Sequence, residues 1–267
     1  MVVLKKMPVK HNFISGLLGE RRDIDSTSQI LKRARSYFNK SLRTLPAYYQ
    51  EKQGSLVEFV VPGGLIEIER YWLQEPYAFA SILEDRSTKY YKLIEPRLTK
   101  YEKKLLERIY EDFQDILVLN FTTSRLEKDT LLVDKTLYLL ERYRAKISAS
   151  AIHKIIYYLR RNLLGYNKIN PLLYDPYIED ISCDGVEIPN YIYHTKYFNI
   201  ESNISFKEDE LDSFVIRMYQ LTNKHISVSQ PIVDATIQDG SRLQAILGRE
   251  SLPEAALLPS VNSGRTP

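Results

Sequence analysis

Cysteine and long apolar runs are both scarce in this chain of 267 residues. Cys183 is the single cysteine. It can form neither an internal disulfide nor a cysteine-based zinc site, which favours a reducing setting. No window approaches the roughly 20 apolar residues of a membrane-spanning helix. The N-terminus also lacks the apolar core of a signal peptide. We therefore expect a cytoplasmic protein.

The pattern that binds nucleotide phosphates is also missing. A P-loop has the form G-x-x-x-x-G-K-[ST], in which backbone N–H groups and a lysine hold the phosphates. None of the 10 glycines opens that pattern, and the four histidines are scattered. We assign no catalytic residue and no metal site, and a stand-alone hydrolase is disfavoured. ATP hydrolysis by this polypeptide alone is not expected.

The charge balance is only weak evidence for an anionic partner. Lys and Arg number 37 against 34 Asp and Glu, a net charge of +3, and they are spread along the chain. The 20 tyrosines lie at spacings typical of a core, and no basic stripe is visible. A nucleic-acid-binding module therefore stays an alternative hypothesis rather than the leading one.

The spacing of apolar residues and the positions of turn residues predict an α+β fold with two sheets and no βαβ repeat. Strands are predicted at 56–61, 65–72, 77–83 and 88–96, with a Pro-Gly-Gly turn at 62–64, which together indicate a small antiparallel sheet. A second sheet is predicted from 178–183, from 191–200 as one strand, from 203–206, and from two short strands around the Asp239-Gly240 turn.

Four helices are predicted between and after these strands. The first begins at a capping box formed by Thr99 and Glu102 and continues to residue 117. Two more span 128–144 and 148–164, the latter with Ser148 near its start and Gly165 just past its end. The fourth spans 207–221. Each has an apolar stripe that is better explained by core packing than by a membrane surface.

One stretch resembles a known family. The pieces, in order, are Gly165 with INPLLYDPYIEDISCDG, then IPNYIYHTKYF, NISF, Arg217 in an amphipathic helix, HISVSQPIVDATIQDGSR, and the closing Arg242. Together, residues 163–244 resemble the N-terminal domain of the type II/IV secretion-superfamily ATPases, which drive secretion, type IV pili and the archaeal flagellum. The segment YYKLIEPRLTKYEKKLLERIYEDF resembles the archaeal branch.

The resemblance implies a domain plan. Residues 1–30 are expected to be a flexible N-terminus. Residues 31–126 would form an N-terminal α+β subdomain of helices and a small antiparallel sheet. Residues 127–249 would form a helical hairpin and a PAS-like antiparallel sheet with flanking helices. Residues 250–267 look unrelated to the family or disordered. In relatives the P-loop lies beyond the position of Arg242, so we expect this chain to stop before it.

The resemblance also implies two nucleotide-binding residues, Arg217 and Arg242. In relatives, arginines at these positions approach phosphates held mainly by the RecA-like ATPase domain. Guanidinium suits that task because it is permanently charged and grips two oxygens at once. The alternative is an ordinary ion pair, for which Asp212 is a neighbour of Arg217. We favour the nucleotide role for Arg242. For Arg217 we weigh nucleotide binding and an ordinary ion pair equally.

The acidic cluster Glu179, Asp180 and Asp184 has no histidine at ligand spacing, so strand-edge and turn roles are preferred over metal binding. The leading hypothesis is the regulatory and docking domain of a hexameric ATPase. Its partners would be its own ATPase domain, neighbouring subunits and an integral-membrane platform protein, at the inner face of the cell membrane. ATP and Mg²⁺ would belong to the full-length parent, with neither held tightly by this chain. Nucleic acid is an unlikely partner.

Overall fold

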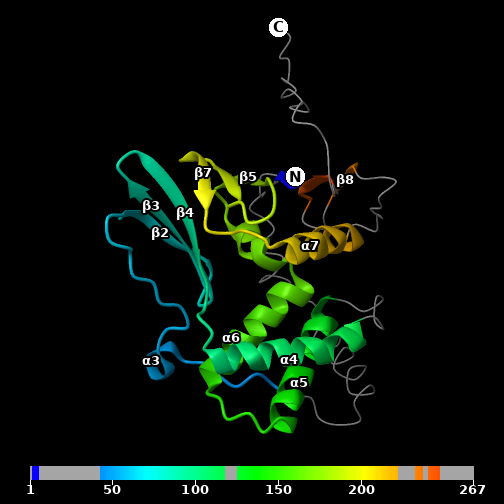
Figure 1. The fold of residues 1–267 in the computed structure, drawn as a ribbon. Coiled ribbons are helices and arrows are strands. Elements are labelled where there is room, and N and C mark those ends of the chain that lie inside the picture. The colour runs from blue at the N-terminus through cyan, green and yellow to red at the C-terminus, as the bar shows by residue number, and fades with distance from the viewer. Residues whose placement is uncertain (1, 6–42, 118–124, 222–231, 237–239, 247–267) are drawn as a thin grey trace, which may run out of the picture.

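The computed structural model describes residues 2–5, 43–117, 125–221, 232–236 and 240–246. The strands of this part form a nine-stranded sheet in the order β2-β3-β4-β7-β6-β5-β1-β9-β8. In Figure 1 helices gather below the sheet, and a further helix lies beneath β8. The predicted α+β class is confirmed. The two predicted sheets lie side by side in one mixed sheet.

The first part of the sheet is an antiparallel meander. Its strands are β2 (Ile66–Gln74), β3 (Ala78–Asp85) and β4 (Thr88–Ile94). These confirm three of the predicted strands. The strand predicted at 56–61 is wrong, because this segment pairs with no strand. Its apolar residues are nevertheless used, since Leu56 and Val57 are buried against Phe79 and Ile94.

The second part contains β5 (Ile178–Cys183), β6 (Tyr191–His194) and β7 (Phe198–Ser202). The single strand predicted at 191–200 is wrong, because β6 and β7 form a hairpin in which His194 lies opposite Phe198. No Gly, Pro or Asn marks the turn at 195–197, so the sequence carried no breaker signal there. The strand predicted at 203–206 is also absent. Only an isolated bridge joins Phe206 to Val186.

A parallel pair joins the two parts of the sheet. Tyr90 and Tyr91 of β4 lie opposite Glu201 and Ser202 of β7. The remaining strands pair in antiparallel fashion. More than a hundred residues separate the two partners in the chain, so no local signal in the sequence could reveal this contact.

The start of the chain fills a central place in the sheet. β1 (Val2–Lys5) pairs on one side with β5 and on the other with β9 (Arg242–Ile246). Leu4 is 1% exposed. The prediction of a flexible N-terminus is therefore wrong for these four residues, and residues 6–30 lie outside the described part. β9 pairs in turn with β8 (Ile232–Thr236), which confirms the two predicted short strands.

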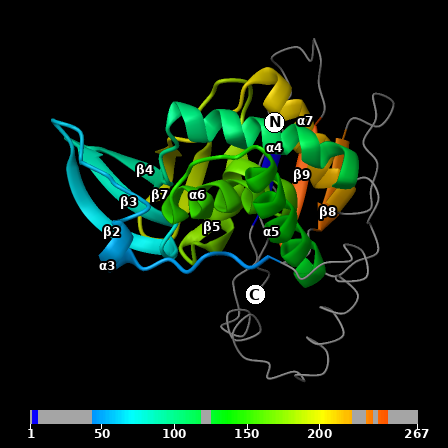
Figure 2. The same cartoon turned by 90° about the horizontal axis from the view of Figure 1, so that it is seen from below.

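Three helices pack beneath the sheet (Figures 1 and 2), and they confirm the predicted ones. They are α4 (Lys100–Leu117), α5 (Arg125–Arg142) and α6 (Ala149–Leu159). The capping box is present, since the Thr99 backbone N–H donates to Glu102 Oε2 at 2.7 Å and the Glu102 N–H donates to Thr99 Oγ1 at 3.2 Å. Ser148 Oγ likewise accepts from the Ala151 N–H at 3.2 Å.

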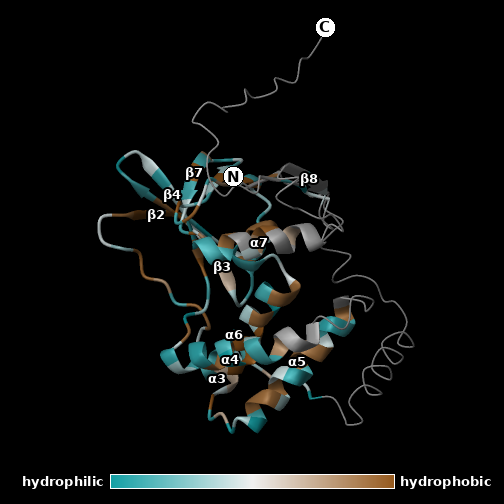
Figure 3. Ribbon diagram, turned by 45° about the vertical axis from the view of Figure 1, so that its right-hand side comes forward, coloured by the Kyte–Doolittle hydropathy of each residue, from teal (hydrophilic) through white to brown (hydrophobic). Residues whose placement is uncertain are grey.

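These helices bury one face each, as Figure 3 shows by the hydrophobic and hydrophilic residues that alternate along α4 and α5. Leu105, Ile109 and Phe113 of α4 join a core cluster with residues of α5 and α6. The fourth predicted helix is α7 (Glu208–Leu221), whose Phe214 and Met218 pack into the core of the sheet. A short helix, α3 (Gln50–Gln53), lies before the meander.

Helix α6 continues into the π-helix η1 (Arg160–Leu164), and the 3-10 helix η2 (Asn167–Tyr174) leads on to β5. Gly165 separates η1 from η2. A Cβ at this position would lie 2.3 Å from Asn170 Oδ1 and 2.8 Å from the Arg161 carbonyl oxygen. Glycine is therefore required here by close approach, and the predicted helix stop at this residue is confirmed.

Candidate functional site

Arg242, the stronger of the two predicted site residues, begins β9 near the edge of the sheet. Its guanidinium holds Asp234 of β8. Nε lies 3.0 Å from each carboxylate oxygen, and Nη2 also donates to Oδ2. The side chain is 61% exposed. The hydrogen bonds from Arg242 to Asp234 raise the pKa of the guanidinium. The structure therefore shows an accessible arginine whose fork already grips one carboxylate.

The register of the strands places Arg242 in a row of polar residues across the sheet. Arg242 lies opposite Lys5 of β1, and Lys5 lies opposite Asp180 of β5. Directly opposite residues of antiparallel strands share one face of the sheet. Leu4, next to Lys5, is buried on the other face. Arg242 itself is exposed, so it lies on the solvent-facing side of the sheet, which we call the outer face.

Arg217 lies within α7, whose residues Phe214, Val215 and Met218 are buried. Its side chain lies outside the described part, so the predicted contact with nucleotide and the alternative pair with Asp212 both stay predictions. Nothing described brings Arg217 and Arg242 together. Asp234 takes Nε and Nη2 of Arg242, whereas a guanidinium has five N–H donors in all.

A buried polar cluster lies inside the fold, and the sequence did not reveal it. Asp175 Oδ2 accepts from the hydroxyls of Tyr71 at 2.8 Å and Tyr91 at 2.7 Å, while Oδ1 accepts from the Tyr177 N–H at 2.8 Å. Asp175, Tyr91 and His194 are each 0% exposed. Burial is the main cause that raises the pKa values of Tyr71 and Tyr91, and the Asp175 charge adds to it.

His194 extends this cluster. Its Nδ1 accepts from the Lys196 N–H at 3.1 Å, so the ring proton lies on Nε2, which is 3.2 Å from the Tyr71 hydroxyl oxygen. Burial lowers the pKa of His194, which keeps the imidazole neutral near pH 7. We name Asp175, Tyr71, Tyr91 and His194 the inner cluster. A histidine beside a carboxylate can serve catalysis, but Asp175, Tyr91 and His194 are fully buried and only Tyr71 is half-buried, which favours a structural role.

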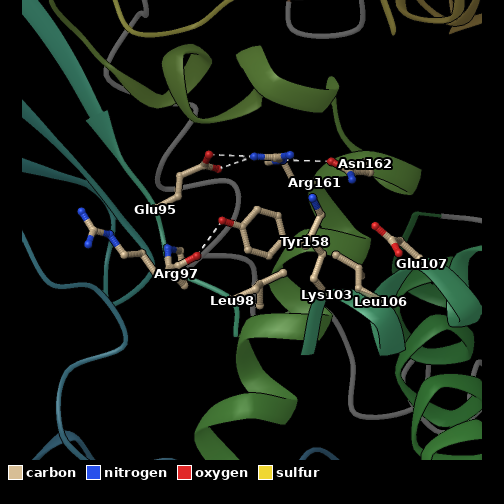
Figure 4. Close-up of a pocket in the computed structure, with 10 residues that line it drawn as sticks. Glu95, Arg97, Leu98, Lys103, Leu106, Glu107, Tyr158, Arg161 and Asn162 are labelled. Atoms are coloured by element: carbon tan, nitrogen blue, oxygen red, sulfur yellow. Dashed lines mark hydrogen bonds and ion pairs between the residues drawn. The ribbon is translucent and has the colours of Figure 1, made fainter. Parts of the chain in front are cut away.

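A cavity of about 470 Å³ lies where the connection after β4 meets α4 and η1 (Figure 4). Its wall includes Arg161, whose Nη1 lies 2.8 and 2.7 Å from the two oxygens of Glu95. The guanidinium carbon also lies 4.7 Å from the centre of the Tyr158 ring, and the Tyr157 hydroxyl donates to Glu95 at 2.7 Å. Because Glu95 already neutralises Arg161, this contact mainly joins the sheet to the helices.

The acidic cluster Glu179, Asp180 and Asp184 lies along β5 and just beyond its end. Ser182 Oγ donates to Asp184 Oδ1 at 2.7 Å. In the part of the chain that the structure describes, no group of three or more His, Cys, Asp or Glu residues is arranged to hold a metal ion. No helix of that part is long and apolar enough to cross a membrane.

Comparison with known proteins adds an independent observation. Residues 25–97 match the family described as PilB3-like, N-terminal. This match fits the N-terminal domain of a type II or type IV secretion ATPase. The matched stretch ends with the meander β2–β4, whereas the resemblance drawn from sequence patterns lies at 163–244. Both observations, from different parts of the chain, therefore indicate similarity to the N-terminal module of a pilus or secretion ATPase.

Three proteins of Methanocaldococcus jannaschii are similar to this chain, and each is described as uncharacterized. MJ1288 is 40% identical over 167 residues, which cover 61% of this chain and 66% of that protein. MJ0900 is 30% identical over 112 residues, or 42% of this chain and 20% of its own length. MJ0781 is 32% identical over 73 residues, which cover 27% of this chain and 10% of that protein. The chain thus spans less than two thirds of each of these proteins.

Proposed function

We propose that this chain is the N-terminal regulatory and docking module of a hexameric ATPase that powers pilus or archaellum assembly or protein secretion. The match of residues 25–97 to a PilB3-like N-terminal domain is the observation that carries this proposal. The module would work at the inner face of the membrane, against a platform protein.

Within this function, Arg242 lends its charge to a nucleotide site that the RecA-like domain completes. The exposure of its side chain supports this role. Bound there, ATP with Mg²⁺ would supply the phosphoryl group whose presence the module senses. The contribution of this chain is to hold the Arg242 side chain in place through Asp234 while the other N–H donors of the guanidinium meet the phosphate. Arg217 is a second candidate for the same site.

The experiment joins this chain to a polypeptide that carries the P-loop domain and measures ATP turnover of the assembly. Arg242→Ala should lower kcat by about tenfold or more, because arginine contacts to a transferring phosphoryl group have effects of this size or larger. Arg70→Ala is a matched control, because Arg70 also grips a carboxylate, that of Glu67, through two hydrogen bonds at 2.8 and 2.9 Å. Its kcat should stay unchanged.

Two results would contradict the proposal. Strong magnesium-dependent ATP turnover by this chain alone would show that it is not a module dependent on another domain. Equal kcat values for the Arg242→Ala and Arg70→Ala assemblies would remove Arg242 from the nucleotide site. The second result would leave the docking role standing, and the first would not.

A further inference from the structure

Exposed aromatic side chains gather on the outer face of β6 and at the start of β7, where Phe198 lies opposite His194. Because Ile192 and His194 lie in the core, the alternation of the strand turns Tyr191 and Tyr193 outward. The exposed fractions are 37% for Tyr191, 38% for Tyr193 and 63% for Phe198. The rings of Tyr193 and Phe198 meet edge to face, with centroids 6.2 Å apart. We call these three residues the aromatic face.

Phe198 is held out in an unusual backbone conformation. Its φ is 59°, in the left-handed region, where glycine and asparagine are favoured and a bulky residue is rare. Burial does not compensate for this, since the ring is mostly in solvent. Unfavourable backbone conformations persist mainly where surrounding structure enforces them, and they gather at binding sites. The hairpin therefore presents an aromatic ring at a position where folding alone favours a small residue.

Carboxylates border the aromatic face. Glu201 lies directly opposite Tyr191 in the neighbouring strand. Ser182, on the other side of Tyr191, holds Asp184 through a hydrogen bond of 2.7 Å. Asp180 lies opposite Tyr193, although Lys5 follows it in the same row. The negative charge is therefore strongest around Tyr191.

The local charge is opposite in sign to that of the whole chain. Residues 178–202 contain five acidic residues and one basic residue, Lys196, whereas the chain has a net charge of +3. Lys196 does not neutralise this surface, because its Nζ lies 2.7 Å from Glu69 Oε1 and 4.3 Å from the centre of the Tyr177 ring. The strands and turns that carry the aromatic face thus have a net negative charge.

We propose that the aromatic face binds a positively charged polypeptide segment of a partner protein. Arginine or lysine groups of that segment stack on the rings of Tyr191, Tyr193 and Phe198, because the negative π-face attracts a cation. Glu201 and Asp184 pair with the same groups from the side and set the preference for positive charge. The same chemistry occurs inside the chain, where Arg161 covers Tyr158 at 4.7 Å.

Charge argues against the other occupants of such a face. Nucleic acid also stacks on exposed tyrosines, but its phosphates would meet Glu201 and Asp184. A second copy of the chain would place one acidic surface against another, which costs free energy through like-charge contact. The inference does not depend on the ATPase proposal, since it follows from the outer face alone.

The test uses the whole chain and a fluorescein-labelled peptide of alternating arginine and leucine, with fluorescence anisotropy measured at low salt. The double variant Tyr191→Ala/Tyr193→Ala should raise the Kd about tenfold or more, and Glu201→Gln should raise it a few-fold. Tyr101→Ala is the matched control, because Tyr101 is a 51% exposed tyrosine on α4 outside the aromatic face. Its Kd should equal that of the unaltered chain.

Circular dichroism verifies that each variant is folded. If the double variant does not fold, Glu201→Lys, which keeps all three rings, should weaken binding of the arginine peptide at least as much as Glu201→Gln. Equal affinity for a peptide with glutamate in place of arginine would overturn the proposal. So would single-stranded DNA binding that is lost in the double variant, or sedimentation showing a dimer that is lost in Phe198→Ala.

Discussion

The two faces of β6 use the same kinds of side chain for opposite purposes. Inward, His194 belongs to the inner cluster, where Tyr71 and Tyr91 place their hydroxyls on Asp175, with Tyr91 fully buried and Tyr71 half-buried. Outward, Tyr191 and Tyr193 lie beside carboxylates and remain more than a third exposed. The comparison teaches that residue type does not assign the role of a tyrosine in this protein. Burial and the hydrogen-bond partner of the hydroxyl assign it.

Removing the central carboxylate of the inner cluster should have the largest effect. Asp175→Ala deprives two buried hydroxyls and one backbone N–H of their acceptor, and each loss carries a desolvation penalty. We expect the free energy of unfolding to fall by about 3 kcal/mol or more, as measured by urea denaturation. Asp184→Ala, which removes an exposed carboxylate near the outer face, should stay within about 0.5 kcal/mol. Similar decreases in the free energy of unfolding for both variants would contradict the proposed difference between the inner cluster and the outer face.

The inner cluster should also make stability depend on pH. The folded pKa of His194 lies below its usual value of about 6.5. Below that pH the unfolded chain binds a proton that the folded chain refuses, so this stability is full above pH 6.5 and is lost as pH falls toward the folded pKa. The slope from this group is at most about 1.4 kcal/mol per pH unit.

The measurement for this dependence is the midpoint of urea denaturation, followed from neutral pH downward. His194→Gln keeps an N–H donor toward Tyr71 but has no titrating ring, so its curve should be flatter than that of the unaltered chain in this range. Parallel curves for the two proteins would assign the acid sensitivity to other groups and would weaken the account of the inner cluster.

The smallest effect should come from single hydroxyl groups. Tyr91→Phe removes one donor to Asp175, and we expect a loss of about 1 kcal/mol. Tyr193→Phe removes a hydroxyl on the exposed face and should stay within about 0.5 kcal/mol. Thermal unfolding of the pair gives the comparison, because the two substitutions delete the same atom. A larger loss for Tyr193→Phe would mean that its hydroxyl has a structural partner.

Local elements were predicted well where they depend on neighbours in the chain. The Thr99 and Glu102 capping box, the apolar stripe of α4 and the stop at Gly165 all act within a few residues, and the structure contains each of them. The hairpin between His194 and Phe198 was missed because its turn lacks a breaker residue. The place of Phe198 depends on its pairing with β6, which no local pattern encodes.

Of the candidate site, the sequence supplied Arg242 and the acidic residues of β5, but it did not supply their neighbours. The ion pair of Arg242 with Asp234 depends on the register of β8 and β9. The inner cluster joins Tyr71 to a residue 104 positions away. Contacts of that separation are fixed only when strands pair and helices close over them.

By itself, the sequence determined the α+β class, most helices and the absence of a P-loop pattern among its glycines. These follow from composition and from periods of a few residues. Only the tertiary structure decided that two sheets become one, that residues 2–5 form an interior strand, and that Tyr71 and Tyr91 contact Asp175 while Tyr191 and Tyr193 of β6 face outward. Those outcomes arise because backbone hydrogen bonds and apolar burial are satisfied between segments far apart in the chain.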